Sequence, residues 1–242
     1  MDPETSALLY ADESGEIVGV DEVQLLDEVP ADRIPALRAL LCGDDLGTRF
    51  GSLLLLAAWG DSDGLASAEQ FLSSTGNEFD GLNPHRLHDQ DRTYDLIADA
   101  LSLAVRVRGM DPAQVTPHAE RLLDMATSQF FEHGLQRLVT AIADPALGAE
   151  TDAVVRRLAR DGRHREASDL LPAVAATDPV AASEALNLFR TDTGFMDESV
   201  TGVATTLGRI RSEAAISELE SLQQSEQPGA ATAAKFALDF GF

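Results

Sequence analysis

Histidines and carboxylates gather in one short segment of the chain. His85 and His88 are three residues apart, and Asp89 and Asp91 follow them. Two histidines at this spacing can share a helix face, and imidazole and carboxylate groups are common zinc ligands. A metal-dependent enzyme is therefore one interpretation. However, an Asn-Pro pair precedes the segment, no Cys or Glu stands near it at ligand spacing, and such short motifs often match by accident. We expect no bound metal.

Other catalytic patterns are also incomplete. His88-Asp89 matches the dipeptide of helical phosphohydrolases, but the further His and Asp positions that those enzymes need are missing. Iron-dependent hydroxylases built from helical repeats use several His-Glu dipeptides, and here none of the histidines is followed by Glu. The sequence also lacks a phosphate-binding loop, a Gly-x-Ser-x-Gly motif and a Cys/His nucleophile pair. We therefore expect no catalytic residues and no cofactor.

The same segment is a candidate for binding another protein. Residues 73–92 contain Gly, Asn and Pro and have no helical period, and a loop of this length in a compact chain is usually functional or disordered. Tyr94 follows on the next helix and is expected to act as an aromatic anchor of the kind found at binding hot spots. The predicted partner-binding residues are His85, Arg86, His88, Asp89, Asp91, Arg92 and Tyr94. The alternative is a mobile insertion whose arginines pair with local acids.

The elements that flank this segment have the spacing of amphipathic helices. Residues 48–59 form the most apolar stretch, which we expect at the centre of the fold. After residue 93, apolar residues recur at intervals of three and four, which is typical of a helix with one buried face. Asp-Pro pairs at 111, 144 and 178 predict helix starts, because Asp can cap a helix and Pro suits its first turn.

The two ends of the chain share a pattern. A shift of 182 residues places Ile34, Leu37, Leu40, Gly47 and Leu56 on Ile216, Leu219, Leu222, Gly229 and Leu238. This shift equals about six units of ~30 residues, which is within the range of helical repeats. The phrases LGRIRSEAAISELESL (from Leu207) and AAWGDSDGLASAEQFL (from Ala57) resemble the HEAT-like repeats of phycobilisome-lyase-type proteins. The resemblance implies an all-α, right-handed α-solenoid of HEAT-like helical hairpins, forming one domain over residues 1–242.

The N-terminal segment is strongly acidic. Residues 1–32 hold ten acids and no Lys or Arg. Apolar runs at residues 7–10 and 17–20 flank a Gly-containing polar turn, so we expect either a short β-hairpin or a frayed first helix. In either form the segment would cap the first repeat, because a terminal repeat must cover an apolar face.

Composition limits the partners. The formal net charge is −23, which disfavours nucleic-acid binding and would attract basic partners, although it also fits a simple gain in solubility. No apolar run approaches the ~20 residues that cross a membrane. The start lacks the pattern of a signal peptide, and the single Cys42 suits a reducing compartment, so we expect a cytoplasmic protein.

Three functional hypotheses remain. The first is a non-catalytic protein-binding solenoid. Within that class, the segment NPHRLHDQDRTYDLIADA, which begins at Asn83, is similar to segments of HEAT-like proteins encoded beside polymorphic toxins. That resemblance implies a bacterial immunity protein that neutralises a cognate secreted toxin, with a basic toxin domain as its partner. The second hypothesis is a HEAT-like lyase or a metal-dependent enzyme that uses His85 and His88. The third is a scaffold or adaptor in a larger assembly.

Overall fold

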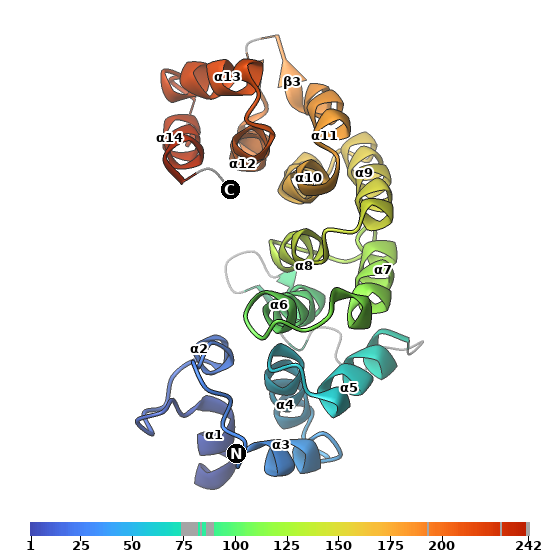
Figure 1. Ribbon diagram of the computed structural model, residues 1–242, viewed down its shortest axis with the longest axis vertical. Helices are drawn as coiled ribbons and strands as arrows, with labels where there is room; N and C mark the ends of the chain where they lie inside the picture. The colour runs from blue at the N-terminus through green and yellow to red at the C-terminus, as the bar shows by residue number, and fades with distance from the viewer. Residues whose placement is uncertain (74–81, 83, 86–89, 193, 228, 241–242) are drawn as a thin grey trace. The chain divides into compact units, whose positions relative to one another are not determined.

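The computed structural model describes residues 1–242 except 74–81, 83, 86–89, 193, 228 and 241–242. The described part is mostly helical, which confirms the all-α class (Figure 1). By contact density the chain divides into two compact units, Met1–Leu122 and Leu123–Phe242, and the division falls within one helix, α7. The single repeat domain over residues 1–242 remains a prediction.

The first unit is organised around one central helix. Its helices are α1 (Pro3–Tyr10), α2 (Val20–Gln24), α3 (Ile34–Leu40), α4 (Leu46–Ala58), α5 (Ser62–Ser73), α6 (Thr93–Arg106) and the start of α7 (Thr116–Met125), which follows a 3-10 turn at Pro112–Gln114. Helix α4 packs against α1, α2, α3, α5 and α6. Residues 50–58 of α4 are all buried, so the prediction that this apolar stretch is central is confirmed. Gly64 allows α5 to approach α4 closely, because a Cβ there would lie 2.6 Å from the Ala57 nitrogen.

The second unit contains two sets of helices. Its helices are α8 (Gly134–Ile142), α9 (Pro145–Arg160), α10 (His164–Thr177), α11 (Pro179–Ala185), α12 (Val200–Ile210), α13 (Glu213–Gln223) and α14 (Ala230–Phe240), with 3-10 turns at Leu186–Phe189 and Asp197–Ser199. Helices α8, α10, α12 and α14 contact one another in that order. Helices α9, α11 and α13 lie along one side of this row, and each packs against an even-numbered neighbour (Figure 1). Within the unit, successive helices therefore alternate between two rows.

The helix starts follow the capping chemistry of the sequence. The side chains of Asp111, Asp144 and Asp178 each accept a hydrogen bond from a backbone N–H in the turn that they precede, and Pro is the first residue of each turn. These bonds satisfy amides that lack a partner within the helix. The Asp-Pro pairs thus mark helix starts as predicted, although the turn after Asp111 is a 3-10 turn.

Extended structure is minor in the described residues. Strands β1 (Pro84–His85) and β2 (Gln90–Asp91) form one antiparallel pair, and β3 (Arg190–Thr191) and β4 (Gly194–Phe195) form another. The N-terminal hairpin is not formed as such, because residues 7–10 belong to α1 and only an isolated bridge joins Ala11 to Ile17. The physical reason is the cap: Asp2 accepts from Thr5 N, with Pro in the first turn, and this arrangement starts a helix.

The 182-residue shift aligns helices of the first unit with helices of the second in sequence. It carries α3 into α13 and α4 onto α14, and each of these pairs of consecutive helices packs together. Leu37 and its counterpart Leu219 are both buried, at 0% and 1% exposure. The sequence similarity between the two ends of the chain therefore corresponds to two similar helical hairpins.

Candidate functional site

The predicted partner-binding segment is only partly described. Its described backbone contains the β1–β2 pair, in which Pro84 faces Asp91 and His85 faces Gln90. Arg86, His88, Asp89 and the His85 side chain lie outside the described residues, so their roles remain predictions. The described members of the set are Asp91, Arg92 and Tyr94, and each of them has a role inside the fold.

Asp91 organises the start of α6. Its Oδ1 accepts hydrogen bonds from the Thr93 backbone nitrogen, at 2.9 Å, and from the Thr93 hydroxyl, at 2.6 Å. Such bonds satisfy amide groups that the first helical turn leaves without intrahelical partners. Asp91 therefore holds the junction between β2 and α6.

Arg92 forms an ion pair with Asp95 in the first turn of α6. The two side chains approach to 3.6 Å, with 37% of the Arg92 side chain and 4% of the Asp95 side chain exposed. A carboxylate as deeply buried as Asp95 needs a partner, because leaving a buried charge unpaired costs several kcal/mol. Arg92 neutralises Asp95 and still reaches the surface.

Tyr94 belongs to the core. It is 2% exposed, and its ring stacks on Phe71 of α5 at a centroid distance of 5.7 Å. The expectation that Tyr94 is an exposed anchor for a partner is therefore corrected. The helical period explains why Tyr94 is buried. Ile97, Ala98 and Leu101 follow it at intervals of three, four and seven residues, which places them on the same helix face, and all three are buried.

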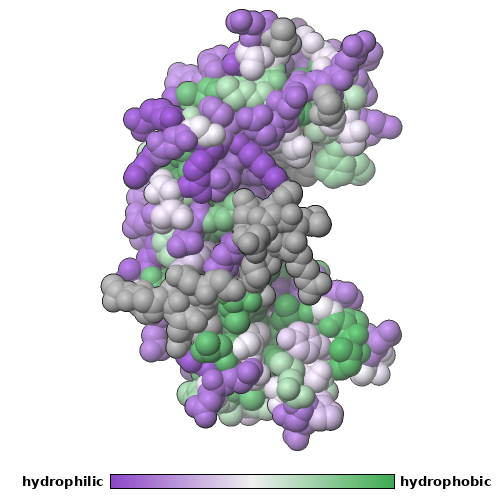
Figure 2. All heavy atoms as spheres, turned by 180° about the vertical axis from the view of Figure 1, so that it is seen from behind, coloured by the Kyte–Doolittle hydropathy of each residue, from purple (hydrophilic) through white to green (hydrophobic). Residues whose placement is uncertain are grey.

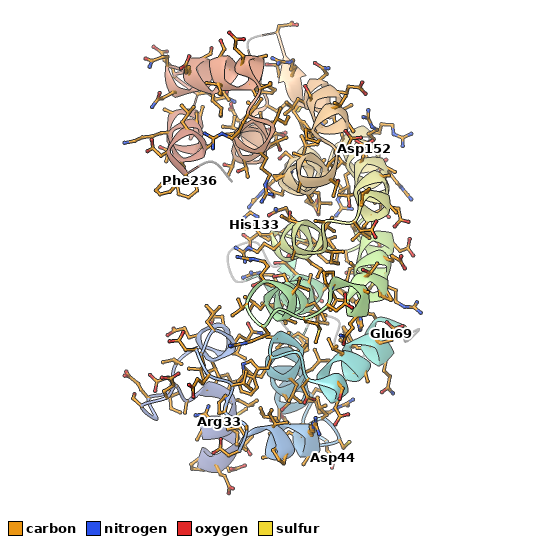
Figure 3. All side chains as sticks on the ribbon, in the orientation of Figure 1. Arg33, Asp44, Glu69, His133, Asp152 and Phe236 are labelled. Carbon is orange, nitrogen blue, oxygen red and sulfur yellow. The ribbon has the colours of Figure 1, made fainter. Side chains whose placement is uncertain are left out.

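A polar cluster that the sequence did not reveal joins α5 to α7. His118 is 5% exposed, and its Nε2 lies 3.1 Å from Leu65 O and 3.9 Å from Glu69 Oε2. Glu69, labelled in Figure 3, also accepts a hydrogen bond from Arg121 Nε at 2.9 Å. The cluster pins the two helices together within the first unit. No short motif could have found it, because His118 and Leu65 are 53 residues apart.

The arginines of residues 156–165 are largely balanced by acids. Arg156 pairs with Asp152 at 2.7 Å, and Arg163 pairs with Glu166. The hydrogen bond that Arg163 donates to the Glu166 carboxylate is the largest factor that raises the pKa of Arg163. Arg163 also donates to the carbonyls of Thr127 and Gln129, which follow the end of α7. These ion pairs lie between residues three or four positions apart in the sequence, so they are local charge balance within the helices.

The acidic N-terminal segment is folded, and its carboxylates point outward. We call the following exposed residues the N-terminal acidic surface: Glu13, Glu16, Asp21, Glu22, Asp27 and Glu28. Arg33, labelled in Figure 3, reaches this segment and donates to the carbonyls of Ala11, at 2.6 Å, and Asp12, at 3.2 Å. It thus binds the backbone and not the carboxylates.

Arg108 acts in the same way at the end of α2. Its guanidinium donates to the carbonyls of Gln24, Leu26 and Asp27, at 3.1, 2.6 and 3.2 Å. These carbonyls come at the C-terminal end of a short helix, where intrahelical partners are missing. A guanidinium carries five N–H donors, so one side chain can satisfy several carbonyls at once. The two arginines order the segment and leave its carboxylates to the solvent.

Large apolar side chains are exposed in the same unit. Ile17 is 57% exposed, Leu25 is 55% exposed, and Val107, which precedes Arg108, is 47% exposed. On the face drawn in Figure 2, hydrophobic residues reach the surface of the first unit at several places, whereas hydrophilic residues cover most of the second. Ile17 and Leu25 lie within the sequence of the acidic segment, so acids and apolar groups share its surface.

The chain matches no known family model, curated protein or solved structure. Among the described residues, no helix combines the length and the apolar character that crossing a membrane requires. Over the same residues, no three His, Cys, Asp or Glu side chains are grouped so that they could hold a metal ion.

Proposed function

We propose that this chain is a non-catalytic protein-binding protein, built as a right-handed solenoid of HEAT-like helical hairpins. Within that class we propose an immunity protein that neutralises a cognate secreted toxin with a basic domain. The alternation of two helix rows in the second unit, together with the hairpin repeated at both ends of the chain, supports the solenoid. Stacked helical hairpins offer an extended surface for partners.

The observation that carries the proposal is the construction of the N-terminal acidic surface. In the described structure, the arginines that reach this segment bind backbone carbonyls, as Arg33 and Arg108 do. Among the described residues, these two arginines therefore form no ion pairs with the exposed carboxylates. A surface with one sign of charge raises the association rate with an oppositely charged protein, and added salt lowers that rate.

The exposed apolar residues supply the other component of an interface. Protein interfaces combine a desolvated apolar centre with a polar rim, and charges at the rim mainly set the association rate and specificity. Ile17 and Leu25 are exposed in the same segment as the exposed Glu16, Asp21 and Glu22, so the segment offers both apolar and charged groups to a partner. The irregular segment 73–92 remains a second predicted contact, through Arg86 and Asp89.

Calorimetric titration of the full chain with the protein encoded by the adjacent gene tests this proposal. We expect binding that weakens as salt increases and that falls about tenfold when Glu16→Gln and Glu22→Gln are combined. The matched control combines Glu213→Gln and Glu220→Gln, which removes the same charge from exposed positions of the second unit. If both variants lost the same amount of affinity, the effect would come from the net charge of the chain and not from the N-terminal acidic surface. If neither variant lost affinity, the proposed surface would be refuted.

A further inference from the structure

The segment that carries the N-terminal acidic surface buries few of its side chains. We call residues 12–28, which follow α1 and include α2, the α2 strap. Within the strap, only Val23, Gln24 and Leu26 are buried. Helix α2 packs against α1 and α4 (Figure 1). The strap therefore gains little from apolar burial, while ordering its backbone costs conformational entropy at every residue.

Two arginines from outside the strap hold its two ends. At the start, Arg33 donates to the Asp12 carbonyl at 3.2 Å. At the end, Arg108 donates to three backbone carbonyls, those of Gln24, Leu26 and Asp27. Between these points, the Gln24 side-chain amide donates to the Leu54 carbonyl of α4 at 3.1 Å. Side-chain donors thus attach the strap to the elements around it.

The backbone bonds of the strap are mostly internal. The N–H groups of Val23, Leu25 and Leu26 donate to carbonyls of the strap itself. The Val18 N–H donates to the Tyr10 carbonyl at 2.7 Å, next to the point where the strap begins. Detaching the strap from α4 and from Arg108 would therefore break no hydrogen bond within α4.

The helix beneath the strap is much more deeply buried. Residues 50–58 of α4 are all buried, and α4 packs against α1, α3, α5 and α6 as well as α2. Local openings of a protein range in free energy from almost zero to the value for global unfolding, and segments with few buried apolar contacts open most easily. We therefore expect the strap to open at a lower free energy than α4.

We propose that the α2 strap opens and closes over α4 as a unit while α4 stays folded, and that Arg108 holds the strap closed. All the carboxylates of the N-terminal acidic surface lie in the strap, so this surface has a formed and an unformed state. The inference deepens the proposed function and rests on it for one consequence: a partner that binds the closed strap would slow its opening by mass action.

Native-state hydrogen exchange of the full chain, without a partner, tests the strap. The amides of Val23, Leu25 and Leu26 report on the strap, and those of residues 53–58 report on α4. We expect the strap amides to exchange at least about a hundredfold faster than those of α4. In up to about 1 M urea the strap rates should stay constant while the α4 rates rise, because urea sensitivity scales with the surface that opening exposes.

Substitution of Arg108 tests what holds the strap closed. Arg108→Ala should speed exchange of the strap amides by about tenfold or more, because several carbonyls lose a charged donor. The strap rates of this variant should remain insensitive to urea. Arg106→Ala is the matched control, because it removes the same charge from the exposed last position of α6, and it should leave the strap rates unchanged.

Three results would overturn the proposal. Equal rates and equal urea dependence for the strap and α4 would show that the strap opens only when the fold unfolds. Unchanged strap exchange in Arg108→Ala would show that Arg108 does not hold the strap closed. Equal acceleration in Arg106→Ala would assign the effect to the loss of positive charge. These results require no partner, so they are distinct from a failure of the proposed function, which would be a lack of binding.

Discussion

Gly202→Ala tests the closest helix approach in the second unit. Gly202 lies in α12, where a Cβ would meet the backbone of α10, at 2.2 Å from Ser168 O and 2.4 Å from Ser168 C. These are backbone atoms of a packed helix, so no side-chain rotation can relieve the overlap. The two helices must separate to admit the methyl group.

The expected loss of stability follows from two opposing effects. Replacing Gly by Ala in a helix interior stabilises it by about 1 kcal/mol. Forcing an extra carbon into a packed interface costs about 1–3 kcal/mol, and a clash with backbone belongs at the upper end. Val203 and Ala204, which are fully buried beside Gly202, would also lose contacts. We expect a net loss of about 2 kcal/mol, which lowers the Tm of a chain of this size by roughly 4–8 °C.

Thermal melts and urea unfolding of Gly202→Ala measure this loss. The matched control is Gly47→Ala in α4, where the nearest atom to an added Cβ is Asp45 Oδ1 at 3.6 Å, an ordinary contact. The control should be as stable as the wild type or gain up to about 1 kcal/mol. A Gly202→Ala protein that melts at the wild-type temperature would show that α10 and α12 do not pack as described.

Three further substitutions test other parts of the structure. Tyr94→Ala should lower the free energy of unfolding by about 3–5 kcal/mol, because a buried aromatic side chain is removed. An unchanged midpoint of urea unfolding would contradict the burial of Tyr94. Arg108→Ala should cost about 2 kcal/mol through the carbonyls it leaves without a charged donor, whereas Arg106→Ala, at the exposed last position of α6, should be near neutral in the same melts. The hydroxyl and then the amide of Thr48 lower the pKa of Asp45, so this carboxylate stabilises the fold above its unfolded pKa of about 4 and stops doing so as the pH falls through its folded value. Asp45→Asn should therefore lose less stability than the wild type between pH 7 and pH 3, and parallel pH profiles of Tm would contradict this.

The helices and their starts could be predicted because their causes are local. Apolar spacing located α4 and α6, and an Asp before a Pro marked the starts at 145 and 179. Helix ends were harder to predict than helix starts, and α7 ends at Met125. The carbonyls of the residues that follow it are bonded by Arg163, which is more than thirty residues away in the chain.

The surface was predicted less well, for the same physical reason. The acidity of residues 1–32 is visible in the sequence. The hydrogen bonds to the carbonyls at the end of α2, however, come from Arg108, which is over 80 residues later in the chain. Tyr94 was assigned to the surface although its helical phase placed it with buried residues.

The central claim is that the chain acts by binding a protein and not by catalysis. The most direct test of this proposal is to titrate the activity of the proposed toxin partner, the protein encoded by the adjacent gene, with the purified full chain. The account predicts that inhibition is complete at one equivalent of chain, that substoichiometric amounts inhibit only in proportion, and that active toxin is recovered when the complex is dissociated in denaturant and the toxin is refolded. Complete and lasting inactivation of the toxin by a small fraction of an equivalent would show turnover, and the chain would then be an enzyme.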